Sequence, residues 1–149
     1  MKTYQVIKTF GTDRGFSCAF RQWKADSACN QIHGYSLGFK LTLEAADLDD
    51  KSWVYDFGGF INIKNWIEDH FDHTFLISKD DPELELLKEL GNKGVANIIE
   101  LDAVGCEKFA EMTYNFSNQY INEQTNGRVK LLSVEVFEHG ANSAVFKNT

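Results

Sequence analysis

The chain has 149 residues, of which 43% are hydrophobic and 25% are charged, and its formal net charge is -7 at pH 7. This length and composition predict one soluble domain, residues 1–149, with a core large enough to fold without cross-links. The acidic balance argues against a general nucleic-acid binder, which needs a basic face. No apolar run approaches the roughly 20 residues of a membrane helix, so no membrane partner is expected.

The cysteines and the N-terminus indicate the cellular compartment. Cys18, Cys29 and Cys106 stand at unrelated spacings, which fit neither a disulfide framework nor a paired-cysteine zinc motif. The N-terminal residues lack the apolar segment of a secretory signal peptide. The sequence therefore predicts a cytoplasmic protein with free thiols.

The first third of the chain predicts strands separated by irregular segments. Tyr4–Phe10 and Phe16–Phe20 are expected strands, and Gly11–Gly15 between them has turn chemistry. The two strands form either a hairpin or one strand with a bulge. After an irregular stretch over 21–32, Tyr35–Ala45 alternates apolar and polar side chains, which is the period of a half-buried strand.

The remainder of the chain predicts helices followed by strands. In chain order, the expected elements are a short strand Trp53–Tyr55, a helix from Asp56 to Phe71 whose start is weakened by Gly58-Gly59, a second helix from Asp81-Pro82 to Gly91, a short strand Val95–Leu101, a long helix Gly105–Asn122, and strands Leu131–Glu138 and Ala144–Phe146. This order predicts an α+β fold, an antiparallel β-sheet with two main helices packed on one face.

Two polar side chains fall on apolar strand faces. His33 precedes the strand Tyr35–Ala45 in the same register, and Glu138 shares a face with Leu132, Val134 and Val136. A carboxylate in such a place needs a partner, because burying it alone costs several kcal/mol. A pterin or purine edge with two N–H donors would be a suitable partner for Glu138. For His33, a hydrogen-bonded core histidine is the competing interpretation.

Other reactive groups stand near element ends. Cys29 lies in the loop before a strand, where reactive thiols are presented, although a lone cysteine is more often a small buried hydrophobe. Asp72 and His73 form a possible acid–base pair, or a helix cap. Glu107 lies in the first turn of the long helix, where the helix dipole favours an acid in any case. These features predict a small-molecule site but name no reaction.

A basic group surrounds the Cys29 loop. Arg14, Arg21 and Lys24 stand within a dozen residues of one another, and charge-assisted donors of this kind hold phosphates. An ordinary solvated surface is the slightly favoured interpretation.

Several segments together resemble the 6-pyruvoyl-tetrahydropterin synthase / 6-carboxy-tetrahydropterin synthase family. They follow in the family's order and span about Phe16 to Glu138. The matching segments are Gly15–Phe20, Cys29–Tyr35, Trp53–Phe57, Phe71–Leu76, Gly105–Glu107 and Val136–Glu138.

The resemblance implies the tunnelling fold, in which sheets of several subunits join into a barrel, usually as trimers stacked into hexamers, with sites at subunit interfaces. It makes Cys29 the catalytic thiol, with Asp72 and His73 as its proton-relay partners. Glu138 would anchor the pterin, and Glu107 would be a second acid near the ring. These roles are implied by the resemblance alone.

The implied substrate is 7,8-dihydroneopterin triphosphate, whose side chain the bacterial branch shortens to a carboxylate on the route to deazapurines such as queuosine, with loss of acetaldehyde and triphosphate. The family uses zinc held by three histidines. At those positions this chain has Phe20, His33 and Tyr35, so His33 is the one retained ligand. Two alternatives stay open: a metal-free enzyme acting on a pterin or purine ring, of the dihydroneopterin aldolase type, or a non-catalytic pterin-binding protein.

Overall fold

The computed structural model describes residues 1–148, which form a sheet of seven strands and three α-helices. The strands are β1 (Tyr4–Phe10), β2 (Phe16–Phe20), β3 (His33–Ala45), β4 (Thr74–Ser78), β5 (Ile98–Leu101), β6 (Lys130–His139) and β7 (Asn142–Lys147). The α-helices are α1 (Ile61–Phe71), α2 (Leu84–Asn92) and α3 (Cys106–Thr125). The predicted α+β class is confirmed.

The sheet is mixed rather than wholly antiparallel. Its strand order is β5-β4-β2-β3-β6-β7, and β1 also pairs with β3. The pairs β2–β4 and β4–β5 run parallel, whereas the pairs that involve β3 and β7 run antiparallel. The two parallel pairs require crossover connections, which α1 and α2 supply.

β1 and β2 do not form a hairpin with each other. β1 pairs with the stretch of β3 from Phe39 to Ala45, and β2 pairs with the stretch from His33 to Leu37. Both lie on the edge of β3 opposite β6, so they follow one another as an interrupted strand. Of the two predicted alternatives, the single strand with an irregular interruption is therefore correct.

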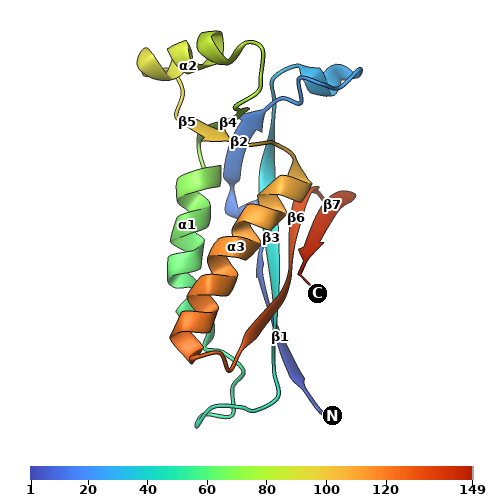
Figure 1. Cartoon of the computed structure of the whole chain (residues 1–149), viewed down its shortest axis with the longest axis vertical. Coiled ribbons are helices and arrows are strands. Elements are labelled where there is room, and N and C mark those ends of the chain that lie inside the picture. The colour runs from blue at the N-terminus through green and yellow to red at the C-terminus, as the bar shows by residue number, and fades with distance from the viewer. Residues whose placement is uncertain (149) are drawn as a thin grey trace.

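The core lies between the sheet and the two longer helices. Figure 1 shows α1 and α3 side by side over one face of the sheet, and α2 beside β4 and β5 at one end. Phe39, Phe71 and Phe109 are fully buried where a strand, α1 and α3 meet. Their rings lie 5.1 Å (Phe39–Phe71) and 5.3 Å (Phe71–Phe109) apart, distances typical of stabilising aromatic pairs.

The structure differs from the predicted elements in several places; for example, the helix expected from Asp56 is a 3-10 turn over Phe57–Phe60 before α1 begins at Ile61. Trp53–Tyr55 is a loop, because its backbone amides serve a turn: Oδ1 of Asp49 accepts the N–H of Trp53 at 3.0 Å. β4 was not predicted, since all five of its residues are buried and show no alternation, as is typical of a strand between parallel neighbours. A register shift in the β3–β6 pair places Leu131, rather than Leu132, in the core.

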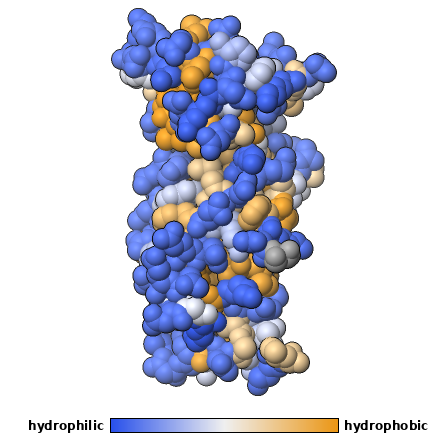
Figure 2. Space-filling model, viewed as in Figure 1, coloured by the Kyte–Doolittle hydropathy of each residue, from blue (hydrophilic) through white to orange (hydrophobic). Residues whose placement is uncertain are grey.

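The face shown in Figure 2 is mostly hydrophilic, with hydrophobic patches between the hydrophilic residues. Within residues 1–148, no helix combines the length and the apolar character that crossing a membrane would require.

Candidate functional site

Three titratable side chains lie close together where β3, β6 and the start of α3 meet. Tyr35 comes from β3, Glu138 from β6, and Cys106 from the start of α3. Glu138 lies at a register shift between Phe137 and His139 in the β6–β7 pair. Bulges of this kind redirect a side chain and often occur beside functional sites. We call Tyr35, Cys106 and Glu138 the Glu138 cluster.

The members of the Glu138 cluster differ in charge: Tyr35 and Cys106 are neutral, and Glu138 is negative. Burial first, and then the Glu138 carboxylate beside it, raise the pKa of the Cys106 thiol to about 12. The pKa of Tyr35 is raised too, first by burial and then by Glu138. Both neighbours therefore keep their protons at neutral pH. Glu138 makes no ion pair with any residue of 1–148, so its negative charge has no cationic partner there.

Cys29 sits on a short turn beside this cluster. It is the central residue of the 3-10 turn Ala28–Asn30, whose first amides are capped by Ser27. The Cys29 thiol is exposed, unlike the other two cysteines, and its negative form would raise the pKa of Tyr35. The exposed thiol therefore faces the same region as the Glu138 cluster. The alternative of a buried, packed Cys29 is wrong.

Asp72 and His73 form a hydrogen-bonded pair at the junction of α1 and β4. Nδ1 of His73 lies 2.8 Å from Oδ1 of Asp72, so in the neutral ring the other nitrogen keeps its lone pair and can accept a proton. His73 has a φ of 58°, an uncommon left-handed conformation that is often found at functional positions. Its side chain is 86% exposed, which leaves the ring open to an incoming group.

The structure does not bring the Asp72–His73 pair to Cys29 within one chain. The amide of His73 donates to the carbonyl of Ser17 near the start of β2, and the amide of Gln22, beyond the end of β2, donates to the carbonyl of Cys29. Three residues of β2 and Arg21 lie between Ser17 and Gln22, which separates the two backbone points by roughly 13 Å or more. The thiol and its predicted relay therefore lie at opposite ends of β2.

The residues at the three positions implied for zinc come together but do not suit the metal. Phe20 and His33 are direct cross-strand partners with rings 5.1 Å apart, and the ring of Tyr35 lies 5.3 Å from His33. Phenylalanine cannot ligate, and the raised pKa of Tyr35 keeps its phenol neutral. No group of three or more His, Cys, Asp or Glu within the described chain is arranged to hold a metal. Zinc does not fit this donor set.

The remaining predicted residues have simpler surroundings. Glu107 is exposed in the first turn of α3, and its charge contributes to the raised pKa of Cys106. The basic residues do not form a phosphate cradle: Arg21 pairs with Asp81 at 2.8 Å, and Lys24 lies 3.2 Å from Asp80. His33 is half-buried, and its Nδ1 lies 2.8 Å from the carbonyl oxygen of Gln31.

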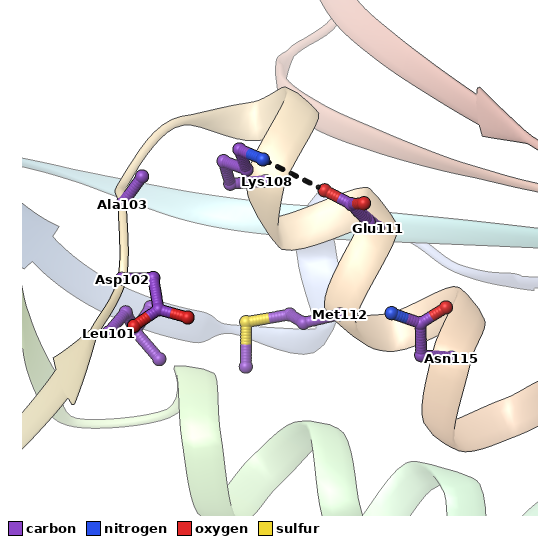
Figure 3. A pocket seen from close by; sticks show the side chains of 7 residues that line it. All are labelled: Leu101, Asp102, Ala103, Lys108, Glu111, Met112 and Asn115. Carbon is purple, nitrogen blue, oxygen red and sulfur yellow. Dashed lines mark hydrogen bonds and ion pairs between the residues drawn. The ribbon is translucent and has the colours of Figure 1, made fainter.

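A separate surface depression lies between α3 and the segment after β5. It has a volume of about 300 Å³ and contains the ion pair of Lys108 and Glu111, as Figure 3 shows. None of the predicted site residues lines it. Asp102, which faces it, is 94% exposed and pairs with Lys79. This depression is therefore a surface feature rather than a built site.

Sequence reasoning missed the roles of two cluster members. Tyr35 was considered only as a position implied for zinc, and Cys106 only as part of a matching segment. A signal for Tyr35 was present, because it begins the inward-facing set of β3. Cys106 had none in the sequence, because its approach to Glu138 depends on how α3 starts against β6.

Comparisons with known proteins agree with this architecture. A 6-carboxy-5,6,7,8-tetrahydropterin synthase of Aquifex aeolicus (strain VF5) is 26% identical over 158 residues, covering 97% of this chain and 98% of that protein. One from Rickettsia typhi (strain ATCC VR-144 / Wilmington) is 35% identical over 57 residues, covering 38% and 41% of the two chains.

Two solved structures have the same fold. An uncharacterized protein from Wolinella succinogenes superposes with a TM-score of 0.85 at 21% identity, over 100% of both chains. A Plasmodium vivax 6-pyruvoyltetrahydropterin synthase, a mutant of a catalytic residue, superposes with a TM-score of 0.71 at 14% identity, over 100% of this chain and 99% of that one. The 6-pyruvoyl tetrahydropterin synthase family model matches residues 10–149, and the chain therefore belongs to that family.

Proposed function

We propose that this protein is a lyase of the 6-carboxy-tetrahydropterin synthase type that acts on 7,8-dihydroneopterin triphosphate, in the synthesis of a deazapurine precursor such as that of queuosine. The observation that carries the proposal is the unbalanced carboxylate of Glu138. It is half-buried and has no cationic partner among residues 1–148, and its neighbours Tyr35 and Cys106 keep their protons. Two N–H donors on the edge of a pterin match its two oxygens. Glu107 is the proposed second acid near the ring.

The proton-transfer groups would come from two copies of the chain. Within one copy, Cys29 and the Asp72–His73 pair lie at opposite ends of β2. Each chain would therefore give its thiol to one site and its Asp72–His73 pair to another. We therefore propose a homo-oligomer, a trimer or hexamer, in which Cys29 of one copy meets His73 of a second copy. Such an arrangement is possible because both groups are exposed.

The proposed chemistry uses the chain's own residues. Asp72 holds the His73 ring so that its free nitrogen takes the proton of the Cys29 thiol. The resulting thiolate, a far better base than the thiol, then removes a proton from the side chain of the substrate. The side-chain carbon next to the ring becomes a carboxylate, with one water supplying its second oxygen, while acetaldehyde and triphosphate leave. The two electrons released by the side chain reduce the 7,8-dihydropterin ring to the tetrahydro level. The donor set at Phe20, His33 and Tyr35 does not fit zinc, so no step is assigned to a metal.

The test is turnover of 7,8-dihydroneopterin triphosphate by the purified protein, followed as triphosphate release and as formation of a shortened pterin. Cys29→Ala should abolish turnover. His73→Asn should do so too, and an equal mixture of the two reassociated variants should recover about a quarter of the wild-type sites if assembly is random. Absence of turnover, with and without added zinc, would contradict the proposed activity.

Because Phe20, His33 and Tyr35 do not fit zinc, they favour a second candidate function, metal-free chemistry on a pterin or purine ring as in dihydroneopterin aldolases. The products separate the two enzymes: triphosphate release with a pterin shortened to a carboxylate supports the synthase, and turnover without triphosphate release supports the metal-free enzyme. In a non-catalytic pterin-binding protein, pterin binding would be found without turnover and would not change in Cys29→Ala.

A further inference from the structure

A buried ionic fork lies under the loop that carries Cys29. Arg21 directly follows β2, and Asp81 lies between β4 and α2, at the same end of the molecule (Figure 1). Nε of Arg21 donates to Oδ2 of Asp81 at 2.9 Å, and Nη2 donates to Oδ1 at 2.8 Å. The Asp81 side chain is only 1% exposed, so this bidentate pair differs from the surface ion pairs of the chain.

The third nitrogen of the same guanidinium reaches the Cys29 turn. Nη1 of Arg21 donates to the carbonyl oxygen of Asn30 at 3.0 Å, directly after Cys29. The next residue, Gln22, donates its amide to the carbonyl oxygen of Cys29 at 2.9 Å. Arg21 and Gln22 therefore close the base of the loop directly at Cys29 and Asn30.

We infer that Arg21 and Asp81 are positioning residues for the Cys29 thiol, an inference that rests on the catalytic role of Cys29 in the proposed function. The turn Ala28–Asn30 is exposed and short, so its own hydrogen bonds fix it weakly. The fork connects it to the buried start of the α2 segment and restricts its motion. A thiol that exchanges a proton with a second copy of the chain needs such a fixed position, because misplacement by about 1 Å is costly.

The same geometry excludes a phosphate-binding role for Arg21. All three of its nitrogens donate within the chain, and the Asp81 carboxylate balances its charge. The hydrogen bond from Arg21 also lowers the pKa of Asp81, which keeps the carboxylate ionised at neutral pH.

The test compares Arg21→Lys with Lys24→Gln. Lysine keeps the positive charge but cannot donate to Asp81 and to the turn as a planar fork. The control variant, Lys24→Gln, removes the solvent-exposed ion pair between Lys24 and Asp80. Lys24 lies in the same loop as Cys29. Asp81 is the less suitable residue to change alone, because its Oδ1 also accepts the amide of Glu83 at 2.9 Å. Amide hydrogen exchange and steady-state kinetics are measured on the assembled protein.

In Arg21→Lys, we expect the amides of Asn30 and Gln31 to exchange about tenfold faster or more, the change expected when a charge-assisted hydrogen bond is lost. Exchange in the core of β6 should stay unchanged. The value of kcat, normalised to alkylatable Cys29, should fall by a similar factor at constant KM, and Lys24→Gln should match the wild type. A merely structural role would change exchange throughout the fold and leave the normalised kcat unaltered.

If Arg21→Lys does not fold, the double variant Arg21→Gln/Asp81→Asn removes both charges together and allows the same measurements. Unchanged exchange of Asn30 and Gln31 in a folded variant would overturn the inference. Lack of turnover in the wild type would contradict the proposed function instead, and the exchange experiment would still decide whether the fork holds the turn.

Discussion

Replacing Glu138 by glutamine should weaken pterin binding without harming the fold. Glutamine keeps the shape of the side chain but loses its charge. Its NH2 group would face an N–H donor of the pterin, where the carboxylate has an accepting oxygen. Glu138 makes no ion pair among residues 1–148, so the change leaves no buried cation unpaired. The thermal midpoint should therefore stay close to that of the wild type.

The magnitude follows from the bonds that are lost. Hydrogen bonds to a charged group contribute about 1.5 to 3 kcal/mol, so the dissociation constant should rise by about 10- to 150-fold. Removing the charge should also lower the pKa of Cys106, which the Glu138 carboxylate raises at present. The second effect reports the proximity of the two residues without any ligand.

The assay is a fluorescence titration with 7,8-dihydroneopterin, repeated with an analogue that lacks the exocyclic amino group. The wild type should lose affinity for the analogue, whereas Glu138→Gln should bind both ligands about equally weakly. Glu135→Gln is the matched control on the same strand, because Glu135 accepts a hydrogen bond from Ser143 at 2.6 Å and lies outside the Glu138 cluster. Equal affinity of the wild type and Glu138→Gln for dihydroneopterin would refute the anchoring role.

Three further predictions concern zinc binding, thiol labelling and stability at high pH. The double variant Phe20→His/Tyr35→His should gain about one zinc per chain after dialysis, because ring positions that already converge would then carry imidazoles; stoichiometric zinc in the wild type would contradict this. At pH 8 a thiol reagent should label Cys29 alone in the folded protein and three cysteines in denaturant, since Cys18 and Cys106 are buried with pKa values of about 12. Because burial raises these two values from 9.0, the stability they contribute is complete below pH 9.0 and should be lost as the pH rises towards 12; an unfolding free energy that does not fall in this window would be evidence against it.

Local patterns predicted the strands and helices that have one buried face. The alternation of Tyr35–Ala45 and the apolar stripe of the long helix each reported directly which side faces the core. β4 is not predicted, because both of its faces are covered and its sequence therefore shows no alternation of apolar and polar residues. Trp53–Tyr55 has strand-forming residues, but the carboxylate of Asp49 uses a backbone amide that a strand would need.

The site was predictable in its residue types and not in its arrangement. Glu138 is a candidate from the sequence alone because a carboxylate on an apolar strand face is costly, a reason that needs no knowledge of its neighbours. The contribution of Cys106 depended on tertiary packing of α3 against β6. The fork of Arg21 with Asp81 joins residues 60 positions apart, and no local signal indicates such a pair.

β2 provides a common reference for every part of the proposed site. Ser17 accepts the amide of His73 at one end of the strand, and Phe20 contacts the His33 ring near the other. Beyond that end, Gln22 holds the carbonyl of Cys29. A shift of β2 by two residues would keep its buried face buried yet move the thiol and the relay by about 6.6 Å relative to their neighbouring strands. We therefore expect the register of this short strand, and not the stability of the core alone, to determine whether two copies of the chain can present the two halves of the proposed site.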